Sequence, residues 1–420
     1  MIVLVVGEGA REHALVWTLA MQGDVVYCAP GNAGTALHGT NVEIASDDIA
    51  GLLRFAYQES IELTVVGPEE PLRLGIVDMF QAVDIPIVGP TAEAAKIETS
   101  KIFARELMKE IGVPCAHGES FGRSDEAIHY LRNTPGPWVV KADGLAAGKG
   151  VVVTDLREEA EAAVVSMMDK KIFGAAGSLI VIEEKLVGRE ISVIALVSGS
   201  SIVPLVSACD YKRALKGDQG PNTGGMGAFC PSGFLTPDRK KWIMDNVMHP
   251  VVARMKELGK PYSGFLYAGL MDDETNGFKV LEFNCRLGDP ETQVIIPRLR
   301  SKLSHLLMAT AKGYLEDRHA WWDDDVRVGV VMTSADYPAP SPVGYAIYGL
   351  DDIESDAVVF HGATRVDPGS DVVRTAGGRV LTVVGRGATM AAAHAHAYKN
   401  MRCIRFYRAQ YRTDIAKVGR

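Results

Sequence analysis

The most informative stretch of this sequence is residues 278–291, which read Phe-Lys-Val-Leu-Glu-Phe-Asn-Cys-Arg-Leu-Gly-Asp-Pro-Glu. Four of them predict a short apolar strand: Phe278, Val280, Leu281 and Phe283. Because alternate residues of a strand face opposite sides, we expect Glu282, Asn284 and Arg286 to share its other face. The Gly-Asp-Pro run that follows is typical of a turn, which would bring Glu291 close to them.

This row of polar side chains has the chemistry of a site for a cation and the phosphates it carries. Carboxylate and amide oxygens, as in Glu282 and Asn284, suit Mg²⁺. The forked guanidinium of Arg286 suits a pair of anionic oxygens. An edge strand with a solvated polar face would give the same pattern, so the rest of the chain has to decide between the two interpretations.

The composition is that of a globular protein with several domains. Its 420 residues exceed what one hydrophobic core usually serves, and they predict about three domains. Basic residues number 44 and acidic residues 52, which gives a net charge of −8. Nucleic-acid binding in general depends on basic patches, so this charge balance argues against it.

Cysteine usage and hydropathy predict a cytoplasmic protein. The six cysteines are scattered without a C-x-x-C pair, which favours reduced thiols over a disulfide framework or a zinc site. The N-terminus enters an apolar strand without the basic segment of a signal peptide. No apolar run approaches the roughly 20 residues that a membrane span needs.

The N-terminal part of the chain alternates apolar strands with helices, an order typical of a parallel α/β sheet. Strands are predicted at 2–6, 25–28, 63–66 and 85–88, and helices at 12–21, 47–58 and 71–82. Residues 7–11, Gly-Glu-Gly-Ala-Arg, form a glycine turn before the first helix. Backbone amides and Arg11 at this helix N-terminus are placed to hold a phosphate.

A dinucleotide-binding domain is the obvious interpretation of this opening, but two positions argue against it. The fingerprint requires a third small residue where the chain has Glu12. It also requires an acidic residue after the second strand, where the chain has Cys28-Ala29-Pro30. A nicotinamide-dependent dehydrogenase is therefore kept only as an alternative.

A second glycine-rich segment joins the predicted strands 138–142 and 151–154. The connection, 143–150, reads Asp-Gly-Leu-Ala-Ala-Gly-Lys-Gly; it lacks the Walker spacing and leads into a strand. We expect a flexible hairpin that closes over a phosphate chain, with Lys149 adding charge. An ordinary glycine-rich hairpin would look alike, but Lys141 inside an apolar strand needs an anionic partner.

The remaining segments complete the expected architecture. Helices are predicted at 91–111, with Lys101 mid-way, and at 158–169, 237–258, 301–314 and 388–401; strands at 179–182, 190–197, 201–207, 265–271, 328–333, 357–360 and 380–384. Residues 210–228 form a long polar loop without periodicity, and such loops are usually functional or disordered. Its basic and amide side chains suit an anionic substrate. An acidic run at 321–325 marks a boundary before a small α+β domain.

In this order, the lysine strand, glycine hairpin, charged strand end and Glu-x-Asn strand resemble the ATP-grasp superfamily. Within it, the chain is similar to the phosphoribosylamine–glycine ligases of purine biosynthesis, essentially from end to end. Six runs carry the resemblance: Gly-Ala-Arg-Glu-His-Ala-Leu (9–15), Ala-Pro-Gly-Asn-Ala-Gly-Thr (29–35), Val-Val-Gly-Pro-Glu-Glu-Pro-Leu (65–72), Val-Lys-Ala-Asp-Gly-Leu-Ala-Ala-Gly-Lys-Gly (140–150), Gly-Pro-Asn-Thr-Gly-Gly-Met-Gly (220–227) and Glu-Phe-Asn-Cys-Arg-Leu-Gly-Asp-Pro-Glu-Thr-Gln (282–293).

The resemblance implies a multidomain protein of α/β and α+β parts. We expect an N-terminal parallel α/β domain at 1–100, an ATP-grasp core at 101–325 and a small C-terminal α+β domain at 326–420. Within the core, residues 121–190 would form a mobile lid that encloses ATP between two sheets.

The resemblance also assigns residues to ATP, metal and substrates. ATP would be held by Lys101, Lys141, Gly144, Gly148, Lys149, Gly150, Glu183, Glu184, Lys185, Leu186 and Glu190, and Mg²⁺, or Mn²⁺, by Glu282 and Asn284. Catalysis would rest on Arg286 and Asp210, and substrate binding on Gly9, Arg11, Asn32, Lys212, Asn222, Thr223, Asp289 and Glu291. Arg286 and the 289–291 turn would face glycine, and the others phosphoribosylamine.

Three positions depart from the family pattern. Ala10 stands where a glycine is expected, and Tyr211 where a histidine commonly follows the aspartate. Leu270 or Met271 occupies a place that holds an acid in many ATP-grasp enzymes. The third departure leaves the remaining protein ligand of the metal open.

The expected function is ATP-dependent ligation of glycine to 5-phosphoribosylamine through glycyl phosphate. We expect small-molecule substrates, no nucleic-acid or membrane partner, and a monomer. Alternatives from other classes are the dehydrogenase above and a nucleotide-binding module without turnover, against which the intact Glu282, Asn284 and Arg286 argue. Within the superfamily, the alternative is another carboxylate–amine ligase.

Overall fold

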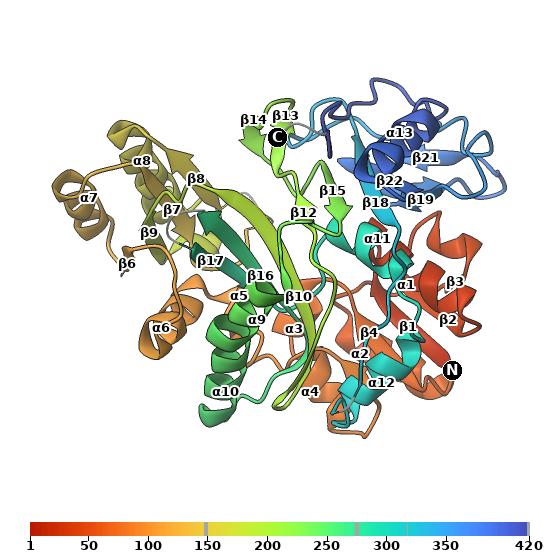
Figure 1. The fold of residues 1–420 in the computed structure, drawn as a ribbon, viewed down its shortest axis with the longest axis horizontal. Coiled ribbons are helices and arrows are strands. Elements are labelled where there is room, and N and C mark those ends of the chain that lie inside the picture. Colours follow the sequence, from red (N-terminus) through yellow and green to blue (C-terminus); the bar gives the residue numbers. More distant parts are fainter. Residues whose placement is uncertain (147–149, 274–276, 317, 418–420) are drawn as a thin grey trace.

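The computed structural model describes residues 1–146, 150–273, 277–316 and 318–417. Figure 1 shows a central antiparallel sheet with an N-terminal part and a C-terminal part on one side of it. A lid projects on the opposite side. Within the described ranges, no helix combines the length and apolar character needed to cross a membrane.

The N-terminal part is a parallel α/β sheet, as predicted. Its strands are ordered β3-β2-β1-β4-β5, and every pair is parallel. The elements are β1 (Ile2–Gly7), α1 (Ala10–Met21), β2 (Val25–Pro30), β3 (Thr40–Asn41), α2 (Ile49–Gln58), β4 (Leu63–Val66), α3 (Glu69–Arg73), α4 (Ile76–Gln81) and β5 (Ile87–Val88). The helix predicted at 71–82 is two helices, because Gly75 between them has a left-handed φ of +83°.

The long helix predicted at 91–111 is wrong. The chain forms α5 (Lys96–Thr99) and α6 (Lys101–Ile111), separated by Ser100 in an extended conformation. The Ser100 hydroxyl accepts a hydrogen bond from the Phe103 amide and donates one to Asp143 Oδ1 at 3.0 Å. Because Ser100 caps α6, Lys101 is the first residue of this helix. The start of α6 lies against Asp143, where the glycine-rich loop begins.

The lid is a separate antiparallel sheet with its own core. Its strands are ordered β6-β9-β7-β8, which confirms the predicted pair at 138–142 and 151–154. The elements are β6 (Gly118–Phe121), α7 (Ser124–Asn133), β7 (Trp138–Ala142), β8 (Val151–Thr154), α8 (Arg157–Val164), a π-helical turn (Val165–Asp169) and β9 (Ile180–Glu184). Side chains of the two helices pack on the sheet, Leu131 and Val164 among them.

The central sheet contains the apolar strand predicted from residues 278–283. Its strands are ordered β11-β10-β16-β17 and are all antiparallel: β10 (Arg189–Ser198), β11 (Ser201–Pro204), β16 (Ser263–Asp273) and β17 (Gly277–Asn284). The segment predicted as one helix at 237–258 packs on one face as α9 (Pro237–Ile243), a π-helical turn (Met244–Met248) and α10 (His249–Glu257). Helix α12 (Leu303–Ala311) packs on the other.

A β-bulge in β17 modifies the predicted alternation. Gly269 pairs with Glu282 but Leu270 pairs with Val280, so Leu281 is an extra residue that pairs with no residue of β16. Such a residue shifts the phase of a strand by one. Val280 and Phe283 therefore both face the core, at 2% exposed each, while Glu282 and Asn284 face a cleft.

The C-terminal residues form an α+β part whose sheet also takes in earlier strands. The order is β12-β15-β18-β22-β19, and α13 packs on it. The elements are β12 (Cys209–Asp210), β15 (Gly227–Cys230), β18 (Val326–Thr333), β19 (Val358–His361), β20 (Thr364–Val366), β21 (Val373–Thr375), β22 (Arg379–Gly387) and α13 (Met390–Met401). The predicted irregular loop at 210–228 instead contains a hairpin, β13 (Arg213–Leu215) and β14 (Gln219–Asn222).

Candidate active site

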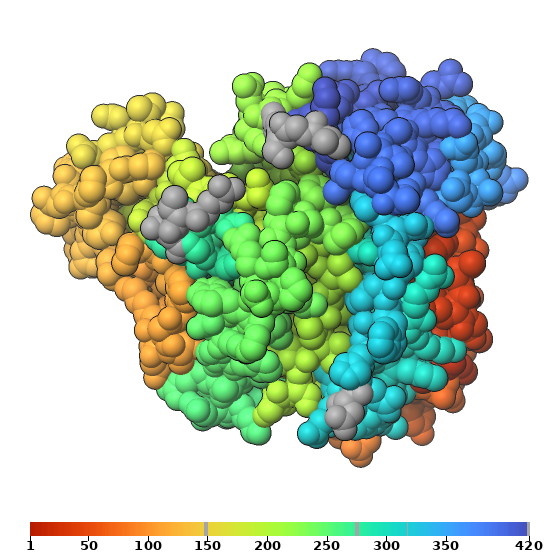
Figure 2. Space-filling view, in the orientation of Figure 1, coloured from red at the N-terminus to blue at the C-terminus, as the bar shows by residue number. Residues whose placement is uncertain are grey.

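A cleft of about 380 Å³ lies where the lid, the central sheet and hairpin β13–β14 meet. Figure 2 shows the molecule hollowed between the lid, in yellow, and the yellow-green hairpin region. Most residues that the resemblance assigned to ATP, metal, catalysis and substrates line it: Lys141, Glu183, Glu184, Lys185, Leu186, Glu190, Asp210, Lys212, Asn222, Thr223, Glu282, Asn284, Arg286, Asp289 and Glu291. Residues spread over 150 positions of sequence thus meet at one cavity.

Arg286 is fixed at the end of β17 by two carboxylates that come from the N-terminal part and α5. Its Nε lies 2.9 Å from Glu69 Oε2, and its Nη2 lies 2.9 Å from Glu98 Oε1. Nη2 also donates to Asn284 Oδ1 at 3.2 Å. Burial would raise the pKa of the Glu69 carboxyl, but Arg286 and Arg11 lower it to about 2. The guanidinium is therefore held in a defined orientation beside Asn284.

Three lysines surround the Glu282 carboxylate. Burial would raise its pKa, but Lys212, Lys101 and Lys141 lower it. The Lys212 ammonium lies 2.6 Å from Glu190 Oε2 and 4.0 Å from Glu282 Oε1. The ammonium groups around this one carboxylate give a local positive charge that suits phosphate oxygens.

The donor set of Glu282 and Asn284 fits a magnesium ion. Both side chains enter the same cleft from β17 and offer oxygen atoms, the ligands that this hard cation prefers. On β16, the described residues that line the cleft are Tyr267 and Met271, neither of which is a carboxylate. Any further oxygen ligands must therefore come from another element, from water or from substrate phosphates.

The lid side of the cleft combines apolar walls with charged strand ends. Val139, Val153 and Leu186 face Met271 and Leu281, which gives a slot of the kind that takes a flat base. The paired charges around it are Lys141 with Glu183 at 2.5 Å, Lys279 with Glu184 at 2.9 Å and Lys185 with Asp155 at 3.0 Å. Lys141 also donates to the carbonyl of the bulge residue Leu281 at 3.1 Å.

A carboxylate with an unusual pKa lies at the base of the cleft. Burial raises the pKa of Asp210 to about 8. The Glu291 and Glu190 carboxylates also raise this pKa, whereas the Lys212 ammonium lowers it. Glu291 accepts a hydrogen bond from Ser192 Oγ at 2.9 Å. Asp210 therefore has the pKa of a group that can exchange a proton near neutral pH.

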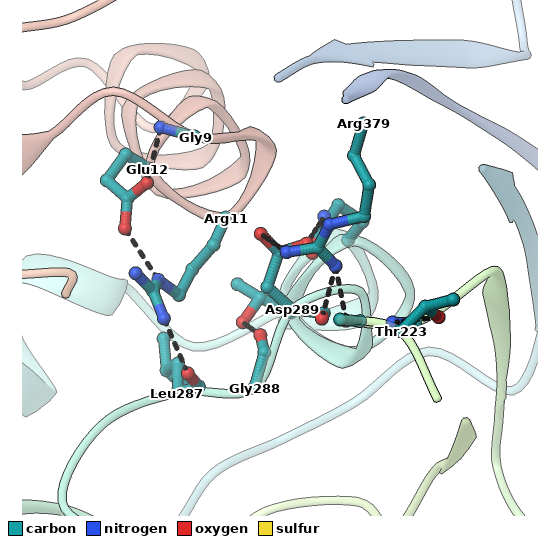
Figure 3. Close-up of polar contacts among 12 residues, drawn as sticks. Gly9, Arg11, Glu12, Thr223, Leu287, Gly288, Asp289 and Arg379 are labelled. Carbon is teal, nitrogen blue, oxygen red and sulfur yellow. Dashed lines mark hydrogen bonds and ion pairs between the residues drawn. The ribbon is translucent and has the colours of Figure 1, made fainter. Parts of the chain in front are cut away.

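A second cavity, of about 310 Å³, lies between the N-terminal and C-terminal parts. Gly9, Asn32 and Asp289 line it together with C-terminal residues that include Thr364 and Arg379. Asp289 lines both cavities, so the two adjoin at this residue. Arg379 donates to the Asp289 carbonyl at 2.7 Å and to its Oδ2 at 2.9 Å (Figure 3).

At the start of α1, Glu12 occupies the groups that the sequence assigned to a phosphate. The Gly9 amide donates to Glu12 Oε2 at 2.6 Å, and Arg11 Nε donates to Glu12 Oε1 at 2.5 Å (Figure 3). Arg11 is buried and also donates to the Leu287 carbonyl. Asn32 donates to the carbonyls of Glu8 and His361, both at 2.8 Å.

The remaining assigned residues lie around the glycine-rich loop. The Lys101 amide donates to the Asp143 carbonyl at 3.3 Å, the Gly144 amide to Ala176, and the Gly150 carbonyl accepts from Ala142. Gly148 and Lys149 lie outside the described residues.

Comparison with known proteins covers almost the whole chain. Family models described as the N, ATP-grasp (A) and C domains of phosphoribosylglycinamide synthetase match residues 1–98, 99–292 and 327–418. A phosphoribosylamine–glycine ligase of Allochromatium vinosum is 48% identical and one of Yersinia pestis 46%, each over 98% of this chain and 97% of the relative. The chain belongs to the phosphoribosylglycinamide synthetase family.

Solved structures agree with this membership. The crystal structure of a phosphoribosylamine–glycine ligase from Thermotoga maritima matches this family member with a TM-score of 0.86 at 31% identity, over 99% of this chain and 100% of that one. A biotin carboxylase domain from Hydrogenobacter thermophilus, solved with MgADP, matches with a TM-score of 0.74 at 13% identity, over 97% and 91% of the two chains. The second match shows a shared fold.

Sequence reasoning missed several residues that shape the site of this synthetase family member. Glu69 had a signal, since it lies in the run 65–72 that carried the resemblance. Glu98 and Arg379 had none, because an isolated charged residue in a helix or strand reads as solvated surface. Only the fold brings Glu98 to Arg286 and Arg379 to Asp289.

Proposed function

We propose that this protein joins glycine to 5-phosphoribosylamine in an ATP-dependent reaction of purine biosynthesis, giving glycinamide ribonucleotide, ADP and phosphate. The observation that carries the proposal is the row Glu282, Asn284 and Arg286 beneath the lid, facing Lys141 and Lys212 across the cleft. The relatives with that name, 46–48% identical over 98% of the chain, support the choice of substrates.

ATP lies with its base in the apolar slot of the lid and its phosphates toward β17. Backbone and side chains of 183–186 with Glu190 hold the adenosine, and Lys101, Lys141 and the loop 144–150 hold the phosphates. Glu282 and Asn284 would hold Mg²⁺, with Mn²⁺ as a substitute ion. The bound ion would neutralise charge on the phosphates, which is the main requirement of phosphoryl transfer.

The proposed reaction has two steps, and the protein supports each with charge and position. A glycine carboxylate oxygen attacks the γ-phosphorus of ATP, and ADP leaves, giving glycyl phosphate. The amine of phosphoribosylamine then attacks the glycyl carbon and inorganic phosphate leaves, giving the amide. Arg286 stabilises the charge that develops on the transferred group. Asp210, beside Lys212, takes the proton that the amine loses.

The two adjoining cavities accommodate the second substrate. Glycine lies at the junction, near Asp289 and Glu291. Phosphoribosylamine extends between Lys212, Asn222 and Thr223 on one side and the second cavity, lined by Gly9 and Asn32, on the other. Arg11 is buried and bonded to Glu12, and it lines neither cavity. Since Glu12 is bonded to both Gly9 and Arg11, these two residues act through Glu12 unless it moves.

The intermediate makes exclusion of water necessary, because an acyl phosphate hydrolyses readily. A lid with its own core can close over the cleft as a unit and remove water.

We further expect a cytoplasmic monomer without nucleic-acid or membrane partners; the six unpaired cysteines and the acidic charge balance support this expectation.

The alternative is another ATP-grasp carboxylate–amine ligase, and a substrate matrix separates the two. ADP release is measured with glycine alone, with phosphoribosylamine alone (formed in place from ribose 5-phosphate and ammonia) and with both. The proposal predicts release only with both substrates and Mg²⁺. Turnover with a different acid and amine, and none with this pair, would retain the ligase class and reject the purine assignment.

A further inference from the structure

Four cleft residues, Asp210, Lys212, Asn222 and Thr223, belong to one segment that runs from β12 to β15. Its central hairpin β13–β14 is a two-stranded sheet on its own. Such a hairpin is marginally stable without other support. The placement of these cleft residues therefore depends on what holds the segment.

Arg412, about 200 residues later in the sequence, binds the hairpin through hydrogen bonds and ion pairs. Its side chain is 1% exposed. Nη1 donates to the Arg213 carbonyl at 2.9 Å and lies 2.8 Å from Asp218 Oδ1. Nε and Nη2 donate to the two carboxylate oxygens of Asp414 at 2.9 and 2.8 Å, and Asp414 accepts the Gly217 amide at 3.0 Å. One guanidinium thus connects the first strand and the turn of the hairpin to the C-terminal segment, residues 412–416.

Tyr211 adds a second link between the same two segments. Its ring centre lies 4.9 Å from the guanidinium carbon of Arg412, within the range of a cation–π contact. Its hydroxyl accepts a hydrogen bond from the Ala416 amide at 3.0 Å. Tyr211 lies between Asp210 and Lys212 in the chain, so both neighbours are fixed by a residue that contacts the C-terminal segment.

The other end of the segment is also held by C-terminal residues. The Thr223 amide and hydroxyl both donate to the Lys212 carbonyl at 2.8 Å, which closes the segment on itself. The Gly224 amide donates to the Tyr337 hydroxyl at 2.8 Å, and Arg379 donates to the Gly224 carbonyl. Lys212, which pairs with Glu190, lies between these two anchored points.

We propose that Arg412 is a positioning residue for the ligation: it clamps hairpin β13–β14 to the C-terminal segment and so sets Lys212, Asn222 and Thr223 against phosphoribosylamine. The identity of that substrate rests on the proposed function, whereas the clamp rests on the contacts above. Arginine is required because its planar fork bonds two carboxylates and a carbonyl at once, and the ammonium of lysine does not reproduce this geometry.

The test compares Arg412→Lys with Arg327→Lys. Arg327 is also buried, at 7% exposed, and its ion pairs are with Asp323 and Asp325 outside the hairpin. We expect Arg412→Lys to raise the KM for phosphoribosylamine by about tenfold while the Kd for ATP stays within about twofold. Hydrogen exchange at the Gly217 and Thr223 amides should accelerate in Arg412→Lys and stay at the wild-type rate in Arg327→Lys.

Each outcome decides the proposal. An Arg412→Lys protein whose KM for phosphoribosylamine and amide exchange match those of the control overturns it. If Arg412→Lys does not fold, Asp218→Asn replaces it, because the Asp218 side chain is 54% exposed. Faster exchange at Gly217 in Asp218→Asn then supports the clamp, and an unchanged rate overturns it. If the wild type shows no phosphoribosylamine-dependent turnover, the proposed function fails, and the exchange rates alone decide the clamp.

Discussion

The two walls of the cleft are built in opposite ways. The lid wall, β6 to β9, is a separate sheet with a separate hydrophobic core. Polar contacts join it to the rest, such as Ser100 with Asp143 and Lys141 with Leu281. The hairpin wall continues through β12 and β15 into the sheet of the C-terminal part. A wall with its own core can pivot as a unit, whereas a wall that shares a sheet keeps its position.

We propose that this difference gives the two walls separate tasks. The lid is suited to admit ATP and then exclude water, which requires motion. The hairpin wall is suited to keep the acceptor amine in line with the activated carboxylate, which requires a fixed position. Strand β17, with Glu282, Asn284 and Arg286, lies between the walls and serves both.

The largest expected effect comes from the buried contacts between α6 and the lid. Arg105 on α6 is 2% exposed and binds Glu183 at 2.7 Å together with the carbonyls of Ala116 and Gly118. Removing one partner of a buried ion pair typically costs about 3–5 kcal/mol. We expect Arg105→Ala to increase hydrogen exchange across β6 and β9 and to raise the KM for ATP. Protection of the hairpin β13–β14 should not change; equal loss in both walls would contradict their independence.

The next effect concerns the strand shared by both walls. Arg286→Ala and Asn284→Ala should each lower kcat by at least about tenfold, equivalent to about 1.4 kcal/mol of transition-state stabilisation. Steady-state kinetics at saturating ATP and glycine measures this. Arg300→Ala is the matched control, because the Arg300 side chain is 70% exposed. Turnover near the wild-type level in both variants would refute β17 as the catalytic centre.

The hairpin wall should give kcat a pH dependence through Asp210 of β12. Burial raises the pKa of Asp210 to about 8, so its base form is populated only as the pH approaches that value. If Asp210 takes the proton of the amine, kcat should rise with pH through about 8, and Asp210→Asn should lose this rise.

The stability of the fold should also depend on the protonation of Asp210. The raised pKa favours the protonated folded state, so the contribution of Asp210 to the free energy of unfolding is complete below the unfolded pKa near 4 and lost as pH rises toward 8. Denaturant unfolding of wild type and Asp210→Asn across this range checks the sign.

The smallest effect is expected at the surface of the lid. Lys185 lies 3.0 Å from Asp155; the Asp155 side chain is 71% exposed and that of Lys185 34%. Exposed pairs contribute about 0–1 kcal/mol. Asp155→Ala should therefore leave thermal unfolding and the KM for ATP close to wild type. A change as large as that of Arg105→Ala would show that surface charges, not the buried contacts of Arg105, hold the lid.

The sequence predicted those parts of the site that lie on a single segment. The strand before Asn284 was correct because apolar residues and polar ligands alternate within a few positions. The bulge at Leu281 was not foreseen, since both phases of the alternation look plausible locally. The division at Ser100 was missed because its partner, Asp143, is 43 residues away.

Long-range pairing explains the remaining misses. The segment 210–228 read as irregular because β12 and β15 complete a sheet with β18, about a hundred residues later in the chain. Arg379 and Arg412 gave no sequence signal for the same reason. Their partners, Asp289 and Arg213, become neighbours only in the folded protein.

The most direct test of the central claim follows the carboxylate oxygens of glycine. Wild-type protein is supplied with glycine labelled with ¹⁸O in both carboxylate oxygens, ATP, Mg²⁺ and phosphoribosylamine, and the released phosphate is examined by mass spectrometry. We expect one ¹⁸O atom in each phosphate, because the carboxylate attacks the γ-phosphorus and loses that oxygen when the amine displaces phosphate. Phosphate without label, formed together with the amide product, would contradict an acyl-phosphate ligase.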